Sequence, residues 1–272
     1  MSSWRGVVRE LTGAVVVITG AAGGLGSAMA RRFAVTGARL ALLDIDQAGL
    51  DALAAELPGD VFTGQCDITD LGQVETVFAA VLARFGGVDV LVNNAGLTHR
   101  SAFADTDPSV LRKVMEVNYF GAVHATKTAL ASLIERQGAI VTISSVAGFA
   151  PLLGRTGYVA SKHALQGLFE TLRAELRETG VDVTIVAPTF VDTPFRHRTL
   201  DGDGSITKHP QSRVGSMLSA EQVAEAVVGA VARRRRFVVL GAVGKLTRFL
   251  VRVSPALYEW VMARSLRSEL ER

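Results

Sequence analysis

The sequence is poor in cysteine and has almost no excess of charge of either sign. Its single cysteine, Cys66, excludes an internal disulfide framework and is typical of a reducing compartment, so we expect a cytoplasmic protein. Lysine and arginine number 29 against 26 aspartate and glutamate residues, a formal net charge of only +3. This balance does not favour binding to nucleic acid.

Long apolar runs, repeats and low-complexity segments are also missing. No stretch approaches the roughly 20 consecutive apolar residues of a membrane-spanning helix, and residues 1–13 lack the apolar core of a signal peptide. We predict no metal site. Hydrophobic residues nevertheless make up 49% of the 272 residues, enough for one large core, so we expect a single domain.

The first recognisable element is an apolar, β-branched run followed by a cluster of glycines. Residues 14–19 (AVVVIT) are typical of a strand that is buried on both faces of a parallel sheet. Gly20, Gly24, Leu25 and Gly26 follow and open a helical pattern. Glycines let a backbone approach phosphate groups, and a helix N-terminus offers free N–H groups. Strand, turn and helix in this order predict a site for the pyrophosphate of a dinucleotide.

An aspartate, Asp44, follows the second predicted strand (residues 39–43), 18 residues after Gly26. A carboxylate at this place can accept hydrogen bonds from the hydroxyls of an adenosine ribose, and it repels a 2′-phosphate. No lysine or arginine lies in the glycine turn or directly after Asp44. The sequence therefore favours NAD over NADP, with an ordinary loop residue as the alternative interpretation of Asp44. Asp46 is the better candidate for the N-cap of the next helix.

Strands and helices alternate along most of the remaining chain. This alternation predicts an α/β fold with a Rossmann-type, doubly wound parallel sheet in three α/β/α layers. Ligands of such sheets bind at the carboxyl ends of the strands, where Asn93-Asn94-Ala95-Gly96 follow the fourth one. Asn118 lies within a long helical segment, at 108–136, among apolar neighbours. The further predicted strands are 61–65, 88–92, 139–144, 181–187 and 237–240.

The stretch from Ser144 to Lys162 contains the candidate catalytic residues. Tyr158 and Lys162 are spaced i and i+4, so both side chains lie on one face if this segment is helical. An ammonium group about 4 Å away favours the phenolate and lowers the pKa of a tyrosine. Ser145 can bind the oxygen on which charge develops, and the three residues can then move a proton to or from an alcohol or carbonyl oxygen. Since Tyr-x-x-x-Lys also occurs by chance on many helices, the motif indicates a catalytic site only in combination with the segments that precede it in the chain.

Residues 188–218 have little periodicity and predict a lid over the substrate, within a domain that spans residues 1–242. The lid contains His197 and His209. Two histidines in a loop of this kind could be catalytic or bind a metal, but more often they do neither.

Residues 243–272 form a predicted C-terminal extension with a basic, amphipathic character. Apolar residues recur at helical spacing on both sides of Pro255, so we expect two helices that break at this proline. Their apolar faces, with Phe249, Leu257 and Trp260, are expected to cover the substrate end of the subunit or of a neighbour. Peripheral contact of residues 245–272 with an anionic membrane is the alternative.

Taken together, these motifs resemble the short-chain dehydrogenase/reductase family, in its classical subfamily, over about residues 11–240. The resemblance implies Tyr158 as general acid/base and Ser145 as the residue that orients the substrate oxygen. It implies that Lys162 lowers the tyrosine pKa and holds the nicotinamide ribose, and that Asn118 supports a water-linked proton relay. The matching residues are Thr19, Gly20, Gly24, Gly26, Asp67, Asn93, Asn94, Ala95, Gly96, Asn118, Ser145, Tyr158 and Lys162.

The resemblance also implies the contacts of the cofactor. Asp67 would contact the adenine, Asn93 and Gly96 would flank the cofactor, and Val191 and Thr193 would touch the carboxamide. The family commonly has Pro-Gly after the sixth strand, whereas this chain has Pro188-Thr189, and threonine does not freely adopt a positive φ. The predicted cofactor-binding residues are Gly20, Gly24, Leu25, Gly26, Asp44, Asp67, Ile68, Asn94, Ala95, Gly96, Tyr158, Lys162, Pro188, Val191 and Thr193.

We therefore expect an NAD-dependent oxidoreductase that interconverts an alcohol and a ketone or aldehyde. A steroid, retinoid-like or fatty alcohol is favoured, because the residues expected around the substrate are largely apolar. The alternatives are a cofactor-binding regulatory or scaffold protein without turnover, and a dehydratase or epimerase on the same fold. The predicted substrate-binding residues are Ser145, Val146, Leu153, Tyr158, Phe190 and Phe195, with Leu97, Phe149 and Leu152 nearby.

Two helical segments, one around Asn118 and one around Tyr158, have apolar residues on more than one face. A helix of this kind needs a second packing partner, which predicts a homodimer or a homotetramer. The residues concerned are Phe120, Leu130, Leu165, Leu168, Phe169 and Leu172.

Overall fold

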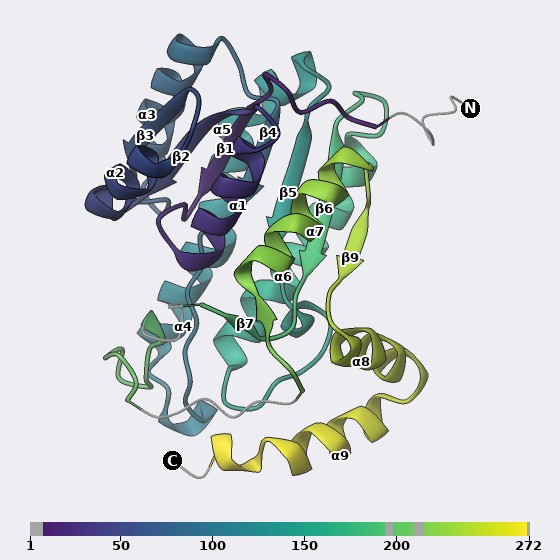
Figure 1. Ribbon diagram of the computed structural model, residues 1–272. Coiled ribbons are helices and arrows are strands. Elements are labelled where there is room, and N and C mark those ends of the chain that lie inside the picture. Colours follow the sequence, from purple (N-terminus) through teal and green to yellow (C-terminus); the bar gives the residue numbers. More distant parts are fainter. Residues whose placement is uncertain (1–7, 194–197, 209–214, 271–272) are drawn as a thin grey trace.

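The computed structural model describes residues 8–193, 198–208 and 215–270. Its centre is one parallel sheet of seven strands in the order β3-β2-β1-β4-β5-β6-β9 (Figure 1). The order reverses between β1 and β4, which is where open α/β sheets bind their ligands. The strands are β1 (Val15–Thr19), β2 (Arg39–Asp44), β3 (Val61–Gln65), β4 (Val90–Asn93), β5 (Ala139–Ile143), β6 (Asp182–Ala187) and β9 (Phe237–Val239).

Helices cover both faces of this sheet, so the predicted doubly wound, three-layer fold is confirmed. Val16 and Ile18 of β1 join the core on one face, and Val15 and Val17 join the core on the other, as the two-residue period of a strand requires. The first face carries α1 (Gly24–Ala34), α2 (Gln47–Glu56) and α7 (Ala220–Ala232), and the second carries α3 (Leu71–Phe85), α5 (Gly121–Glu135) and α6 (Thr156–Glu175).

Capping residues set several helix ends. The Asp46 carboxylate accepts a hydrogen bond from the Gly49 N–H (3.0 Å), so the predicted N-cap of α2 is confirmed. Ser219 and Gln222 form a reciprocal capping box at the start of α7. Gly86, in the left-handed conformation, ends α3. These local signals explain where the three helices begin or end.

The long helical segment predicted over residues 108–136 is not one α-helix. It consists of α4 (Pro108–Met115), a π-helical turn (Glu116–Phe120) and α5. Asn118 lies in this turn and is buried. Such π-bulges occur frequently at functional sites.

The predicted lid region contains more order than its sequence indicates. β7 (Val191–Asp192) and β8 (Leu218–Ser219) pair in a small parallel sheet, which ties both ends of the region to the domain. Phe195, His197 and His209 lie outside the described residues. Short 3-10 turns elsewhere span Phe103–Asp105 and Val146–Gly148.

The predicted break at Pro255 is confirmed. α8 (Ala242–Val253) and α9 (Pro255–Ser265) are followed by a 3-10 turn (Arg267–Glu269), and both helices lie below the carboxyl ends of the strands in Figure 1. Within the described residues, no helix combines the length and the apolar character needed to cross a bilayer.

The sequence prediction names the wrong side chains for the contacts of α8 and α9 within the subunit, whereas their packing on a neighbouring subunit stays a prediction. Tyr258, Met262 and Leu266 turn inward and form a small core with Ala150. The side chains named in the prediction are all exposed in this subunit, namely Phe249, Leu257 and Trp260. An amphipathic pattern identifies two faces of a helix, but here both faces of α9 contain apolar residues, and only the tertiary contacts select the inner one.

Fewer residues are available for contacts between subunits than the sequence indicates. Leu165 and Phe169 are buried in the subunit's own core, and the other leucines of the set pack against the same core. Phe120 is 40% exposed. Assembly into a dimer or tetramer therefore stays a prediction that depends mainly on Phe120.

Candidate active site

A cavity of about 610 Å³ lies at the carboxyl edge of the sheet, between the lid region and the C-terminal helices. All of the residues predicted to bind the cofactor line it, although they come from segments spread between Gly20 and Thr193. The cavity also includes Ser145 and the apolar residues Val146, Leu152 and Phe190. The fold therefore brings the predicted cofactor and substrate residues together in one space.

The glycine turn after β1 has no room for a side chain at two of its positions, Gly20 and Gly26. A Cβ on Gly26 would lie 2.1 Å from the Gly20 carbonyl oxygen, and a Cβ on Gly20, whose φ is +66°, would lie 2.8 Å from the Ala95 Cα. The Asn94 side chain holds the turn from the other side, because its Nδ2 donates to the carbonyls of Thr19 and Gly20, at 3.0 Å each. The turn thus leaves the N-terminus of α1 open toward the cavity, the geometry that suits a pyrophosphate.

Asp44 is buried at the end of β2 and lines the cavity. Its Oδ2 accepts a hydrogen bond from the Ala22 N–H (3.0 Å) and its Oδ1 accepts one from the Asp46 N–H (3.1 Å), so the carboxylate is held firmly in place. Arg198 also lines the cavity, with its Nη2 3.7 Å from the Asp46 carboxylate. The sequence does not indicate this contact, because Arg198 is far from Asp46 along the chain and approaches it only in the fold.

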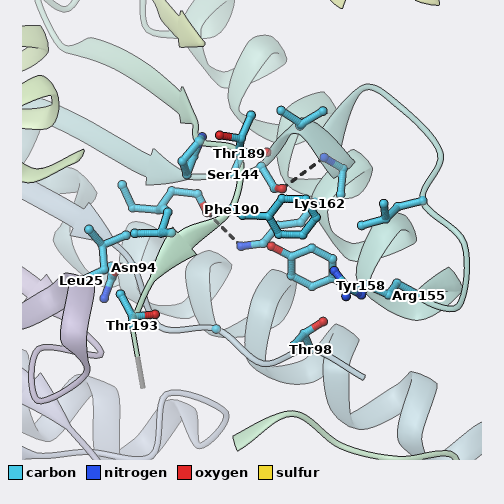
Figure 2. A pocket seen from close by; sticks show the side chains of 18 of the residues that line it. Leu25, Asn94, Thr98, Ser144, Arg155, Tyr158, Lys162, Thr189, Phe190 and Thr193 are labelled. Carbon is cyan, nitrogen blue, oxygen red and sulfur yellow. Dashed lines mark hydrogen bonds between the residues drawn. The ribbon is translucent and has the colours of Figure 1, made fainter. Parts of the chain in front are cut away.

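Ser145 and Tyr158 meet at the centre of the cavity. The Ser145 Oγ accepts a hydrogen bond from the Ala147 N–H (3.1 Å), and the Ser145 side chain is close enough to Tyr158 to lower the pKa of its hydroxyl. Tyr158 lies in the first turn of α6, and Figure 2 shows its ring beside Lys162, with Arg155 nearby. The three residues of the predicted triad therefore line the same cavity.

The pKa of Tyr158 differs from the sequence prediction. Burial raises this pKa, whereas the nearby Ser145 side chain and the positive charge of Arg155 lower it by smaller amounts. Burial lowers the pKa of Lys162 to about 8. The Lys162 Nζ donates to the Ile143 carbonyl (2.8 Å) and lies 5.7 Å from the centre of the Tyr158 ring. In this structure the groups that lower the tyrosine pKa are thus Ser145 and Arg155 rather than Lys162.

Two predicted asparagines do not line the cavity. The Asn118 Oδ1 accepts a hydrogen bond from the Leu97 N–H (2.6 Å), and its Nδ2 donates to the Leu97 carbonyl and to the Ser161 Oγ. Asn93 points into the protein and donates to the Thr126 Oγ1 (2.9 Å). Asn118 therefore joins its π turn to α6 and to the segment after β4, directly behind Lys162.

His99 is a buried residue that the sequence did not single out. Its Nε2 accepts a hydrogen bond from the Gly157 N–H (2.9 Å), and its Nδ1 lies 3.2 Å from the Ser101 Oγ. Burial, together with the charge of Arg155, lowers the pKa of His99 to about 4. A neutral His99 thus anchors the first turn of α6 one residue before Tyr158.

Arg155 and Glu269 form a second unpredicted contact near Tyr158. The Arg155 Nη2 lies 3.8 Å from the Glu269 carboxylate, and both side chains are almost fully buried. Arg155 precedes α6, whereas Glu269 lies in the last described turn of the chain. The C-terminal turn is therefore held against the segment that leads into α6, the helix that contains Tyr158.

Thr189, which stands where the family commonly has glycine, does not adopt a positive φ. Among the described non-glycine residues, only Gln137 and Arg234 do so. The Thr189 side chain packs against the start of α8, where a Cβ on Gly241 or Gly244 would lie within 2.9 Å of it. Val191 and Thr193 follow and still line the cavity. The loop can accommodate a threonine at this position because Gly241 and Gly244, on the facing segment, have no side chains that would clash with it.

The substrate side of the cavity depends largely on the C-terminal helices. Leu153, Leu97 and Phe149 do not line it; Leu153 instead packs against the small core around Tyr258. Arg100 and Arg155 are buried cationic residues in an otherwise mostly apolar lining. Residues of α8 and α9 that the sequence did not predict there include Val243, Leu246, Thr247, Leu250, Tyr258, Val261, Met262 and Ser265.

Comparisons with known proteins agree with this geometry. The model of the short chain dehydrogenase family matches residues 14–203. The Mus musculus dehydrogenase/reductase SDR family member 7B is 38% identical over 268 residues, which cover 95% of this chain and 83% of that protein. A short-chain dehydrogenase from Streptomyces avermitilis superposes with a TM-score of 0.80 at 30% identity, covering 93% of this chain and 98% of its own.

A short-chain dehydrogenase/reductase from Burkholderia phymatum, solved in complex with NAD, superposes with a TM-score of 0.78 at 27% identity. The match covers 90% of this chain and 96% of the other. The extent of these matches confirms the resemblance on which the sequence interpretation relied. The chain belongs to the short-chain dehydrogenase/reductase family.

Proposed function

We propose that the protein is an NAD-dependent oxidoreductase that interconverts an alcohol with a ketone or aldehyde on a lipophilic substrate. The observation that supports this most directly is that Ser145, Tyr158 and the buried Lys162 line one cavity together with the glycine turn. These three residues lie where the glycine turn and the apolar part of one cavity meet. The intact triad favours turnover over a purely regulatory or scaffold role.

The nucleotide side of the cavity fits a dinucleotide. Gly20 and Gly26 form a cradle that a Cβ would fill, and the N-terminus of α1 offers N–H groups to a pyrophosphate. Asp44 would accept hydrogen bonds from the adenosine ribose, which is the basis for preferring NAD. The nicotinamide, when bound, supplies or takes up a hydride.

The protein's own residues handle the proton. Because burial raises the pKa of Tyr158, its hydroxyl is protonated at neutral pH and can donate a proton to a carbonyl oxygen. In the reverse direction the Tyr158 hydroxyl must first lose its own proton to solvent, and the resulting phenolate oxygen then accepts the proton of the alcohol. The Ser145 hydroxyl can donate a hydrogen bond to the substrate oxygen, and it is held in place by the Ala147 N–H.

The lining of the substrate side supports a lipophilic substrate. Phe190, Leu250 and Met262 contribute side chains from three different elements, and water is displaced when an apolar group covers them. Arg100 and Arg155 add positive charge to this lining, and Thr247 and Ser265 add hydroxyl groups. A dehydratase or epimerase on the same site is the second candidate, and it would use Tyr158 in the same acid/base role.

The test is a screen of alcohols and carbonyl compounds of graded chain length, with NAD and NADP compared in parallel. Tyr158→Phe is expected to lower turnover by about 10²–10⁴-fold, the usual contribution of a general acid/base, while the affinity for NAD changes only a fewfold. Tyr119→Phe, a tyrosine outside the cavity, is the matched control. Near-normal turnover by Tyr158→Phe would exclude the proposed mechanism, and product without a change in NADH absorbance would favour the second candidate.

A further inference from the structure

The outer face of α8 and α9 carries a row of exposed apolar side chains. Leu246, Phe249 and Val253 follow one another at i, i+3 and i+7 on α8, where Phe249 is 61% exposed. Leu257, Trp260 and Val261 lie on α9 with the spacing of one helix face, and Trp260 is 60% exposed. We call these six residues the outer apolar face. Monomeric proteins seldom leave such a face uncovered, so it marks an interaction surface.

Basic side chains adjoin this face. Lys245 and Arg252 are exposed on α8 beside the apolar row, Arg248 lies one turn from each, and Arg264 and Arg267 follow on and after α9. Residues 242–270 contain two acidic residues, of which Glu269 is buried against Arg155 and Glu259 is exposed. An exposed apolar stripe beside a row of basic residues is typical of helices that lie in the surface of a bilayer.

The outer apolar face is continuous with the mouth of the cavity. Leu246 and Val261 both belong to it, with 57% and 40% of their surface exposed, and both also line the cavity. Further inside, Leu250 and Met262 of the same two helices continue the apolar lining toward Tyr158. An apolar molecule can therefore pass from this face into the cavity without crossing a polar rim at these positions.

From these observations we infer that α8 and α9 dock on an anionic lipid bilayer, with the outer apolar face in the headgroup region and the cavity mouth open toward the lipid. A second copy of the chain is the weaker occupant, because a twofold contact through the outer apolar face would gather the basic side chains of both copies around its edge. The entry of a lipophilic substrate by this path rests on the proposed function, whereas binding to lipid does not.

The test is sedimentation of the full chain with vesicles of phosphatidylcholine alone or with about 30% phosphatidylserine. We expect binding to the anionic vesicles that weakens strongly between roughly 0.1 M and 0.5 M salt. Lys245→Gln with Arg252→Gln should weaken binding about fivefold for each charge removed, and Phe249→Ser with Trp260→Ser should weaken it by roughly tenfold or more. None of these four side chains lines the cavity.

Matched controls separate the docking face from the rest of the surface. Val35→Ser removes an apolar side chain that is 77% exposed at the end of α1, and Arg177→Gln removes an exposed charge after α6. Both should bind vesicles like the unchanged protein, and all variants should melt within a few degrees of it because the altered side chains are exposed. Sedimentation needs no turnover, so its outcome does not depend on whether the proposed function is right.

Two results would overturn the inference. The first is equal binding of the anionic vesicles by the unchanged protein and by the Phe249→Ser/Trp260→Ser variant. The second is the absence of vesicle binding together with a loss of oligomers in that variant, measured by light scattering, which would assign the outer apolar face to a second copy.

Discussion

The two sides of the cavity are built in different ways. The nucleotide side consists of backbone turns, each of which directly follows a strand, and its tightest points are positions where a Cβ cannot fit, as at Gly20 and Gly26. The substrate side consists of side chains from distant segments, and the last two helices provide much of it. Few substitutions are tolerated on the nucleotide side, because it is built from tight backbone turns. Substitutions in the helices of the substrate side can change that side without disturbing the nucleotide side.

This difference makes the two sides separable by experiment. Changes in the glycine turn should affect the affinity for the nucleotide, and changes at the C-terminal contact should affect the substrate. The following predictions run from the largest expected effect to the smallest.

Gly26→Ala should lower the affinity for NAD by about 100-fold or more, because its Cβ would lie 2.1 Å from the Gly20 carbonyl and must displace the turn. Titration of the purified protein with NADH, followed by fluorescence, measures this affinity. Gly72→Ala, an exposed helical position where the nearest atom is 3.4 Å from a Cβ, is the control and should bind normally. Normal affinity in Gly26→Ala would show that the cofactor does not approach this turn.

Glu269→Gln should raise the KM for the substrate by roughly tenfold and lower the melting temperature, because it removes the carboxylate that faces the buried Arg155 guanidinium. It should also shift the pH profile of alcohol oxidation to lower pH, since the charge of Arg155 lowers the pKa of Tyr158. The affinity for NAD should stay within about twofold. Glu259→Gln, an exposed neighbour on α9, is the control, and an equal effect there would contradict a specific role for Glu269.

Asp44→Ala should raise the affinity for NADP relative to NAD by roughly tenfold, as expected when a carboxylate no longer repels a 2′-phosphate. Arg198 provides a second variant for this test, because its guanidinium lies near Asp46 at the same end of the cavity. If Arg198 contacts a 2′-phosphate in the Asp44→Ala variant, adding Arg198→Ala should remove most of the gain. A preference of the unchanged protein for NADP would contradict the assignment of Asp44.

His99 gives the smallest predicted effect, which appears only in acid. Its pKa is about 4 in the folded protein and about 6.5 when unfolded, so its contribution to stability is complete above pH 6.5 and is lost as the pH falls toward 4. The loss amounts to at most about 3 kcal/mol. In His99→Gln the free energy of unfolding, measured with denaturant, should fall less between pH 7.5 and 4.5, whereas His163→Gln should behave like the unchanged protein.

The sequence is a good guide where a function depends on neighbouring residues. Gly20 to Gly26, Asp44, and Ser145 with Tyr158 and Lys162 follow directly from strand ends or from the spacing of one helix turn, and all of them line the cavity. The same reasoning fails for Leu153, because it cannot tell which side of a loop faces the cavity. It also misassigns the inner face of α9, where apolar residues occur on both sides.

By itself, the sequence determined the order of strands and helices, the glycine turn and the spacing of the candidate catalytic residues, because each of these is a property of a few consecutive residues. Only the tertiary structure decided that Arg198 approaches Asp46, that His99 anchors α6 and that Glu269 faces Arg155. It also decided that the pKa of Tyr158 is raised rather than lowered. These are effects of burial and of contacts between residues far apart in the chain, and no local pattern contains them.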